Sequence, residues 1–464
     1  MWFVSNYEIA YAAIWVLDWV FKLIIYNWVS HITISIMGVI VIVGLFIDKI
    51  RPNIVFSLVF QLLATFTKLL FGGSITGKVF MYLFVLVAAF CLIIWGRFWY
   101  LEPKGKYGVG HREIILKGRD TNPVVSIYYP IDKKYYKKHR NDNSMTSEWT
   151  IEKEKTIEAF NHMTGVPKWI LSFLRAYRLR AVNSAELHKD FAKKSKELTP
   201  VIFSHGLMGN RAIYSSIINQ LVGNGCIVYA LDHTDGTCNY YCDRSGDEPK
   251  DILFEGFDKN KHDVTYKEFI TSQLEHRTRD IKVIIDLVKE EASTNMKCIN
   301  LDKLVSMGHS MGGGTAIESA RLYEQDFKLW VAFDPYLYPI FKSMDKEKNY
   351  GLKQPVCLIN SSGFNKRIDF YDQPGTTAKI LDNSIKKGAT NWKDIVIENS
   401  SHVSQCDIVI MLPFLISVAG VAPRLSSKKG KYLELCNIIV AFLDEHDFFP
   451  TKLDIHVEDY NKNN

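Results

Sequence analysis

Apolar and polar positions divide the chain into two parts with different patterns. As far as about residue 100 the apolar positions form long runs, whereas after Pro200 short apolar runs alternate with stretches of helical periodicity. Short runs without charge are typical of strands buried in a parallel sheet. Their alternation with helices predicts an α/β fold in which helices cover both faces of a mostly parallel sheet.

Buried strands of the second part are expected at residues 201–203, 226–231, 304–307, 329–333, 356–359 and 395–397. Helices are expected at residues 212–222, 265–288, 313–322 and 432–444. Two earlier β-rich runs, 113–116 and 124–129, predict an antiparallel start to the same sheet.

Two segments before Pro200 do not follow this alternation. The polar stretch 132–155 has no periodicity and predicts an exposed loop. Residues 167–180 predict a helix with an apolar face that includes Trp169 and an opposite face that includes Arg175. A basic amphipathic helix of this kind either lies on a membrane surface or packs its apolar side on the core, and both alternatives stay open.

The long apolar runs of the first part lie at residues 9–29, 32–47, 54–71 and 79–95. The second and fourth carry no charge and approach the ~20 residues that a bilayer core requires. The first contains Asp18 and Lys22, so it either crosses the bilayer or lies in its interface. The pattern predicts an all-α transmembrane region of three or four helices at residues 1–103, followed by the α/β domain at residues 104–464.

Basic residues beside these runs predict an orientation. The two loops on one side hold Lys49, Arg51, Arg97, Lys104, Lys106 and Arg112, whereas the opposite side has mainly Lys78. By the positive-inside rule, we expect an integral, multi-pass membrane protein whose α/β domain faces the cytoplasm.

Charge and cysteine usage narrow the function classes. The net charge of +6 over 464 residues is too diffuse to indicate a nucleic-acid partner. The eight cysteines are scattered, without a C-x-x-C pair or a Cys/His cluster at ligand spacing. The pattern therefore supports neither a metal site nor redox chemistry, and no cofactor is expected.

The strongest chemical signal is the sequence G-H-S-M-G at residues 308–312, which follows an apolar run and precedes a small-residue helix start. A G-x-S-x-G pattern between a strand and a helix is the nucleophile elbow of the α/β-hydrolase fold. The serine lies on a tight, strained turn, and larger side chains beside it would collide with the neighbouring strand and helix. Ser310 is therefore the predicted nucleophile.

A serine hydroxyl needs a base to accept its proton and an acid to orient that base. In α/β-hydrolases the acid and then the histidine follow the serine in the chain, each on a loop after a strand. Asp334 directly follows the run 329–333, and His402 lies just beyond the run 395–397, so they are the predicted acid and base. The competing candidates are Asp369, His205 and His309.

The oxyanion of a tetrahedral intermediate needs two backbone N–H donors. One is expected at Met311, the residue after the nucleophile, and the other in the turn S-H-G-L-M-G at residues 204–209, which follows an earlier strand. Leu207 is the predicted second donor, with an uncertainty of one position.

Taken in order, these segments resemble the platelet-activating-factor acetylhydrolases of the plasma type and the intracellular type II. The resemblance covers roughly residues 104–450 and rests on residues 106–110, 127–130, 203–207, 230–237, 308–313, 333–339 and 401–402. There are three departures. The best-known members of the family are secreted or lipid-anchored, whereas the first part of this chain is predicted to span a membrane. The family's common Glu-His-Arg-Asp is Asp-His-Thr-Asp at residues 232–235, and Met311 stands where the family often has an aromatic residue.

The resemblance implies an α/β-hydrolase, here a calcium-independent serine esterase that removes short or oxidised acyl groups from the sn-2 position of phospholipids. It implies a triad of Ser310, Asp334 and His402, with the Leu207 and Met311 amides as oxyanion donors. A membrane-anchored catalytic domain would suit a substrate that resides in the bilayer. The alternatives are another lipid or carboxyl esterase or an acyltransferase on the same fold, and a catalytically inactive membrane scaffold.

Overall fold

The structure is a computed structural model of the full chain, and it describes residues 2–3, 14, 36–39, 52–71, 74–94, 98–99, 101–192, 197–244, 248–340, 353–365, 391–411 and 428–460. The chain divides into two compact units. The first comprises Met1–Tyr100, Phe160–Tyr177 and Ile410–Ala419, and the second comprises Leu101–Ala159, Arg178–Val409 and Gly420–Asn464.

The first unit contains two long helices that pack against each other, α3 (Pro52–Phe71) and α4 (Ile75–Ile94). The Phe60 and Phe84 rings stack between them with centroids 6.2 Å apart. The short strands β1 (Trp2–Phe3) and β2 (Phe98–Trp99) pair antiparallel. The C-terminal part of α6 (Glu154–Thr164), with α7 (Lys168–Leu171) and the 3-10 helix η1 (Ser172–Ala176), also belongs to this unit.

Within the described residues, no helix combines the length and the apolar character that crossing a bilayer requires. The predicted runs 54–71 and 79–95 fall on α3 and α4, whereas nearly all of the runs 9–29 and 32–47 lies outside the described residues. The predicted transmembrane region therefore has no support from the structure.

The second unit is built on a ten-stranded sheet with the order β14-β13-β12-β11-β7-β8-β4-β3-β6-β5. These strands, in chain order, are β3 (Gly108–Ile115), β4 (Val124–Ile131), β5 (Thr146–Glu148), β6 (Arg178–Asn183), β7 (Thr199–Ser204), β8 (Cys226–Asp232), β11 (Val305–His309), β12 (Leu329–Phe333), β13 (Val356–Ser361) and β14 (Trp392–Ile397). The six strands from β14 to β8 run parallel, and β4 pairs antiparallel with both β8 and β3. The mostly parallel sheet and its antiparallel start confirm the α/β prediction.

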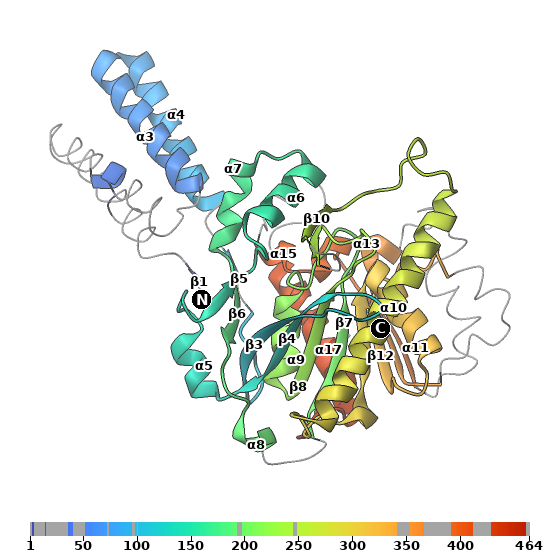
Figure 1. Ribbon diagram of the computed structural model, residues 1–464. Helices are drawn as coiled ribbons and strands as arrows, with labels where there is room; N and C mark the ends of the chain where they lie inside the picture. Colours follow the sequence, from blue (N-terminus) through green and yellow to red (C-terminus); the bar gives the residue numbers. More distant parts are fainter. Residues whose placement is uncertain are drawn as a thin grey trace. The chain divides into compact units, whose positions relative to one another are not determined.

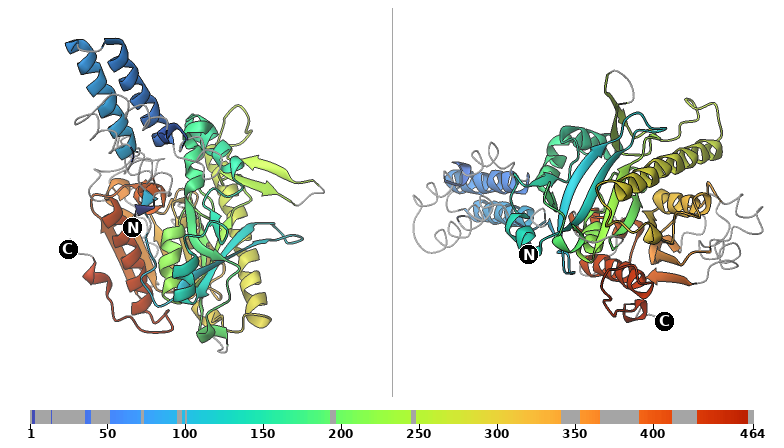
Figure 2. Two further views of the ribbon diagram at one scale, coloured as in Figure 1. Left: turned by 90° about the vertical axis from the view of Figure 1, so that its left-hand side faces the viewer. Right: turned by 60° about the horizontal axis from the view of Figure 1, so that its bottom comes forward.

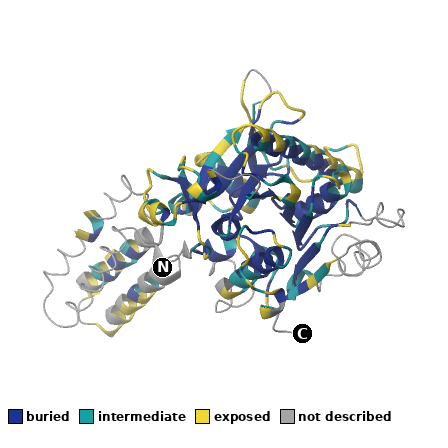
Figure 3. Cartoon of the chain, turned by 90° about the horizontal axis from the view of Figure 1, so that it is seen from below, coloured by how far each residue is buried: buried dark blue, intermediate teal, exposed yellow. Residues whose placement is uncertain are grey.

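Four helices cover the two faces of this sheet (Figure 1). Helices α9 (Ser215–Gly223) and α17 (Lys428–Glu445) contact each other and pack on one face. Helices α10 (Tyr266–Ser293) and α11 (Met311–Leu322) pack on the other face. Figure 2 shows α17 in red and α10 in yellow on opposite sides of the strands. Because both faces are covered, the central strands are buried along their whole length, as the dark blue strands of Figure 3 show.

The remaining elements are small. They are α5 (Lys133–His139), α8 (Lys189–Ala192), the antiparallel pair β9 (Tyr240–Asp243) and β10 (Lys250–Leu253), η2 (Leu301–Lys303), α13 (Ser362–Asn365), η3 (His402–Gln405), α15 (Ile408–Met411) and η4 (Val457–Asp459).

Two sequence-based expectations are wrong. The segment 132–155 is not a loop, because it forms α5, β5 and the start of α6. The predicted helix 167–180 ends early, because Tyr177 is extended and the chain then enters β6, which pairs with β5 and β3. Backbone pairing at the edge of the sheet outweighs the helical period there.

The register of the parallel strands brings three chain segments together at the carboxyl ends of β11, β12 and β13. His309 lies opposite Phe333 in the β11–β12 pair, and Phe333 lies opposite Ile359 in the β12–β13 pair. The residues that follow these strands therefore meet beside the carboxyl ends, where ligands bind in open parallel sheets.

Candidate active site

Ser310 lies on a sharp turn between β11 and α11, with φ 56° and ψ −121°. A residue other than glycine held at such angles is strained by roughly 1–3 kcal/mol. The neighbouring glycines allow the turn to form. A Cβ on Gly308 would collide with the Gly312 carbonyl, and one on Gly312 would lie 2.6 Å from the His205 carbonyl oxygen. Ser310 thus lies on a tight turn between β11 and α11.

The structure brings Ser310, His402 and Asp334 together in a hydrogen-bonded chain. His402 Nε2 lies 2.9 Å from Ser310 Oγ, and His402 Nδ1 lies 3.1 Å from Asp334 Oδ2. Since the carboxylate can only accept, Nδ1 carries the proton and Nε2 accepts from the serine hydroxyl. This is the tautomer that allows the imidazole to take up the serine proton.

The Asp334 carboxylate is fully buried and is also held by Ser361. The Ser361 N–H donates to Oδ1 and its hydroxyl donates to Oδ2, each at 2.6 Å. On the other side, the Phe364 ring stacks on the His402 imidazole with a centroid separation of 4.9 Å. Neither contact was predicted from the sequence, because Ser361 and Phe364 both lie beyond the predicted strand 356–359.

The two competing histidines do not take the place of His402 in this hydrogen-bonded chain. His205 is buried, its Nε2 accepts from the His233 N–H at 3.2 Å, and its Nδ1 donates to the Gly206 carbonyl at 2.7 Å. His309 is buried with Nδ1 2.8 Å from the Tyr214 hydroxyl, and burial together with the neighbouring His402 holds its pKa well below the usual range. Asp369 lies outside the described residues.

The turn at residues 206–209 leaves one amide available. The Gly206 N–H donates to the Tyr214 hydroxyl, the Met208 N–H to the Thr237 carbonyl and the Gly209 N–H to the Gly206 carbonyl. Within the described part of the chain, the Leu207 N–H is the one amide of these four without an acceptor. Met311 begins α11, so its N–H has no acceptor inside that helix. These are the two amides expected to bind an oxyanion.

Ser310 and His402 line a cavity of about 530 Å³. Its wall is mostly apolar and aromatic, with contributions from Leu207, Phe254, Phe257, Tyr266, Phe269, Ile270, Met311, Tyr336 and Phe364. The described lining contains one carboxylate, Glu255, and no lysine or arginine. An apolar pocket with few polar groups at one end suits a hydrocarbon chain that carries a reactive polar group.

Two groups of side chains have metal-ligating atoms within 4.8 Å of one another, His309 with Asp334 and His402, and His205 with Asp232 and Cys238. In the first, His402 and Asp334 are bonded to each other. In the second, the Asp232 carboxylate accepts from the Arg211 N–H and guanidinium, and both His205 nitrogens are engaged. Hydrogen bonds among the described residues thus account for both groups.

Comparison with known proteins identifies the family of this chain. The sequence profile of the family platelet-activating factor acetylhydrolase, isoform II, matches residues 100–454. The platelet-activating factor acetylhydrolase of Canis lupus familiaris is 23% identical over 368 residues, which cover 74% of this chain and 76% of the relative. That of Gallus gallus is 24% identical over 379 residues, covering 74% and 82%.

Among solved structures, a ferulic acid esterase from Streptomyces cinnamoneus has a similar fold. Its TM-score is 0.53 at 17% identity, and the match covers 74% of this chain and 91% of the esterase. The chain therefore belongs to the isoform II family of platelet-activating factor acetylhydrolases, and it is a carboxylic ester hydrolase of the serine type.

Proposed function

We propose that this protein hydrolyses the sn-2 acyl ester of phospholipids, as a calcium-independent esterase of the platelet-activating factor acetylhydrolase type with Ser310 as nucleophile. The observation that carries the proposal is the hydrogen-bonded chain from Ser310 through His402 to buried Asp334, in which Ser310 and His402 line a mostly apolar cavity. The relatives named platelet-activating factor acetylhydrolase support the choice of substrate class.

In the proposed mechanism, Ser310 Oγ attacks the ester carbonyl while His402 Nε2 accepts the hydroxyl proton. The Leu207 and Met311 N–H groups donate to the oxyanion, and each such donor is worth about 3–4 kcal/mol of the barrier. His402 then gives the proton to the leaving alcohol oxygen as the ester bond breaks. Water, deprotonated by His402, attacks the acyl-enzyme and releases the fatty acid and Ser310.

The wall of the cavity indicates which part of the substrate enters it. Apolar and aromatic side chains favour the acyl chain, whereas a phosphate would lose its hydration without gaining a cationic partner among the described lining residues. We therefore place the acyl chain in the cavity and the headgroup outside it.

The test is hydrolysis of a defined phospholipid panel by the full chain with a chelator present. Ser310→Ala is expected to abolish release of the sn-2 acid, because no other described hydroxyl contacts His402 Nε2. Ser319→Ala, which changes a buried serine of α11, is the matched control and should retain activity. Activity that survives Ser310→Ala, or that the chelator removes, would refute the proposal.

The same experiment addresses the alternatives. Hydrolysis of simple or neutral-lipid esters without release of the sn-2 acid from phospholipids would identify another esterase on this scaffold. Transfer of the acyl group to an added second alcohol in preference to water would identify an acyltransferase.

Membrane attachment and a cytoplasmic orientation are a separate proposal. They rest only on the apolar runs of the first 103 residues and on the basic residues beside them. Recovery of the full chain in the membrane fraction after alkaline carbonate extraction would support attachment, and recovery in the supernatant would contradict it.

A further inference from the structure

The turn that carries Leu207 is fixed at both of its ends. On one side the His205 carbonyl accepts a hydrogen bond from Arg277 Nη1 at 2.7 Å. On the other side the Met208 N–H donates to the Thr237 carbonyl at 2.8 Å. Met208 has φ 61°, a strained angle for a residue with a side chain, which persists only where the surroundings impose it. The position of the Leu207 N–H therefore depends on these two anchors.

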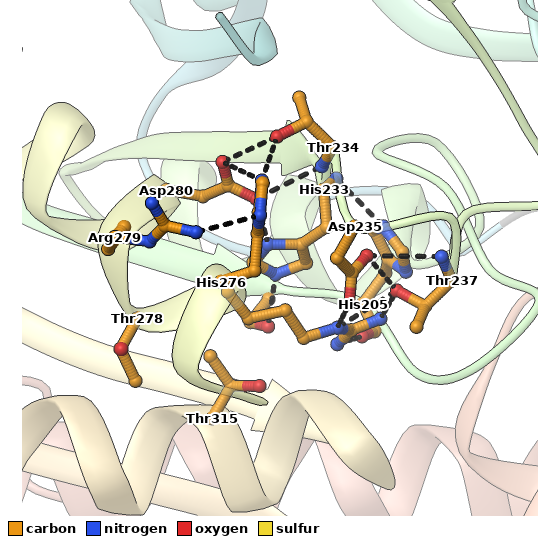
Figure 4. A network of polar contacts seen from close by, with 12 residues as sticks. His205, His233, Thr234, Asp235, Thr237, His276, Thr278, Arg279, Asp280 and Thr315 are labelled. Carbon is orange, nitrogen blue, oxygen red and sulfur yellow. Dashed lines mark hydrogen bonds and ion pairs between the residues drawn. The ribbon is translucent and has the colours of Figure 1, made fainter. Parts of the chain in front are cut away.

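Both anchors converge on the Arg277 side chain, which projects from α10 and is completely buried. Its Nε donates to Thr237 Oγ1 at 3.0 Å and to Asp235 Oδ2 at 3.2 Å, and its Nη2 donates to Thr237 Oγ1 at 2.5 Å. Figure 4 shows the side chains of Asp235 and Thr237 close to His205. One planar guanidinium thus joins α10 to the turn and to the following loop.

The strand end before the turn takes part in a buried relay of hydrogen bonds. Ser204 Oγ lies 2.8 Å from His233 Nε2, and His233 Nδ1 lies 3.0 Å from Asp280 Oδ2. The His233 N–H in turn donates to the His205 ring. These residues repeat the types Ser, His and Asp, but all three are buried, so the relay has no access to substrate.

We propose that Arg277 is a positioning residue for the oxyanion site, holding the His205 carbonyl and the Thr237 loop so that the Leu207 N–H stays aimed at the reacting carbonyl. It does not line the cavity and does not contact Ser310. The inference rests on the proposed function, since it assigns a role within that reaction.

Lysine cannot replace this arginine. It would keep the positive charge beside Asp235, but a single ammonium lacks the fork of donors that reaches the His205 carbonyl and Thr237 Oγ1 together. Displacing one oxyanion donor raises the transition-state energy and leaves substrate binding nearly unchanged. The effect should therefore appear in kcat and not in KM.

The test compares the full-length wild type with Arg277→Lys, Arg277→Gln and Thr237→Val, using phospholipid, a p-nitrophenyl ester and an alkyl trifluoromethyl ketone. The ketone adds reversibly to the serine, and its oxyanion occupies the oxyanion site, so its Ki reports transition-state binding. We expect both Arg277 variants to lose about 10- to 100-fold in kcat, with KM within about threefold. Ki for the ketone should rise by the same factor.

Two controls separate this role from a general structural one. Arg279→Gln changes an exposed arginine of the same helix and should leave kcat and Ki unchanged. Thr237→Ser keeps the hydroxyl and should retain activity, whereas Thr237→Val should lose part of it. If Arg277→Gln does not fold, as shown by the lack of a cooperative thermal transition, Arg277→Lys and Thr237→Val are compared with the wild type instead.

The proposal is overturned if folded Arg277 variants keep kcat and Ki within about twofold of the wild type, or if kcat falls while Ki does not change. Failure of the proposed function gives a different result. A wild type that hydrolyses the p-nitrophenyl ester but not phospholipid refutes the phospholipid assignment, and the Arg277 comparison on the simple ester still stands.

Discussion

At the scale of single residues, the Asp334 carboxylate is the most tightly held group of the candidate site. It accepts from the Ser361 N–H, the Ser361 hydroxyl and His402 Nδ1. The two hydrogen bonds from Ser361 fix the orientation of the carboxylate. The carboxylate in turn orients the imidazole, because Asp334 Oδ2 accepts from His402 Nδ1. Ser361 therefore acts on the reaction through Asp334.

Ser361→Ala is expected to lower kcat about tenfold, because a hydrogen bond to a charged group contributes roughly 1.5–3 kcal/mol and the Ser361 N–H remains in place. Steady-state kinetics on a phospholipid substrate measure the change. Ser362→Ala is the control, since the Ser362 hydroxyl donates to the Ser400 carbonyl at 3.4 Å and not to Asp334. Equal rates for the two variants would contradict the assignment.

The sequence was sufficient to select Ser310, Asp334 and His402, because each follows a strand of recognisable apolar character. The structure brings these three side chains together, and their catalytic roles stay a prediction. Ser361 and Phe364 could not be selected, since a serine and a phenylalanine after a strand carry no signal of their own. Arg277 lies in a helix far from any motif, and only folding shows that it reaches the His205 carbonyl.

At the scale of elements, the close approach of α11 to the end of β7 determines the site. The Gly312 backbone lies against the Ser204 and His205 carbonyl groups, which leaves no room for a side chain. This contact sets the separation between the two expected oxyanion donors, one on the turn after β7 and one at the start of α11.

Gly312→Ala is expected to lower kcat at least about 100-fold, or to destabilise the fold, because main-chain atoms on both sides must move. Kinetics combined with thermal denaturation distinguish these outcomes. Gly430→Ala in α17 is the matched control. Nothing lies within 4 Å of its added methyl group, so a gain of up to about 1 kcal/mol is expected. Wild-type kinetics for Gly312→Ala would show that the contact tolerates a methyl group.

Asp407, which follows η3, links helices α9 and α17. Its carboxylate accepts from the Ser215 hydroxyl at 2.6 Å and the Tyr432 hydroxyl at 2.7 Å, which come from α9 and α17. Burial nevertheless raises its pKa from 3.8 to about 6. Between these values the folded protein binds more protons than the unfolded protein, so the free energy of unfolding falls as the pH rises from about 4 to about 6.

The expected loss of stability is about 3 kcal/mol, the equivalent of roughly two pKa units. It is measured as the difference between the denaturant-unfolding curves of the wild type and Asp407→Asn at several pH values. The wild type should lose this much more than the variant as the pH rises from 4 to 6.5. Parallel pH profiles would show that Asp407 does not titrate in this range.

Strands and helices of the α/β part were predictable because apolar runs in a buried sheet are unambiguous. The wrong prediction of a loop at residues 132–155 lies where a polar sequence forms structure. Helix α5 is fixed by the Asp132 side chain, which accepts from the Tyr135 N–H at 2.7 Å, and it buries only Tyr136. A single apolar contact leaves no periodic pattern, so a capped surface helix looks like a loop.

At the scale of the whole molecule, the cysteine pattern has a measurable consequence. Seven of the eight cysteines have described side chains, and all seven are buried and unpaired. Burial raises the pKa of the Cys406 thiol to about 12 and also raises those of Cys226, Cys357 and Cys436. Thiols of this kind are protected and react slowly.

A thiol reagent such as Ellman's reagent should therefore modify at most one thiol per native chain quickly, and all eight after unfolding. Reducing agents should leave activity unchanged. The assay needs only the native and the guanidinium-unfolded protein. Rapid reaction of two or more native thiols would show that part of this core opens readily.

Helix α10 contributes both to the wall of the cavity and to the support of the turn that carries Leu207. Tyr266, Ile270 and Gln273 line the cavity, and Arg277 follows on the same helical face. A shift of α10 along its axis would alter both the length of acyl chain that the cavity accepts and the stabilisation of the tetrahedral intermediate. Under the proposed function, a substitution in this wall that changes the preferred substrate is therefore expected to change kcat as well, unless a second substitution restores the contact between Arg277 and the turn.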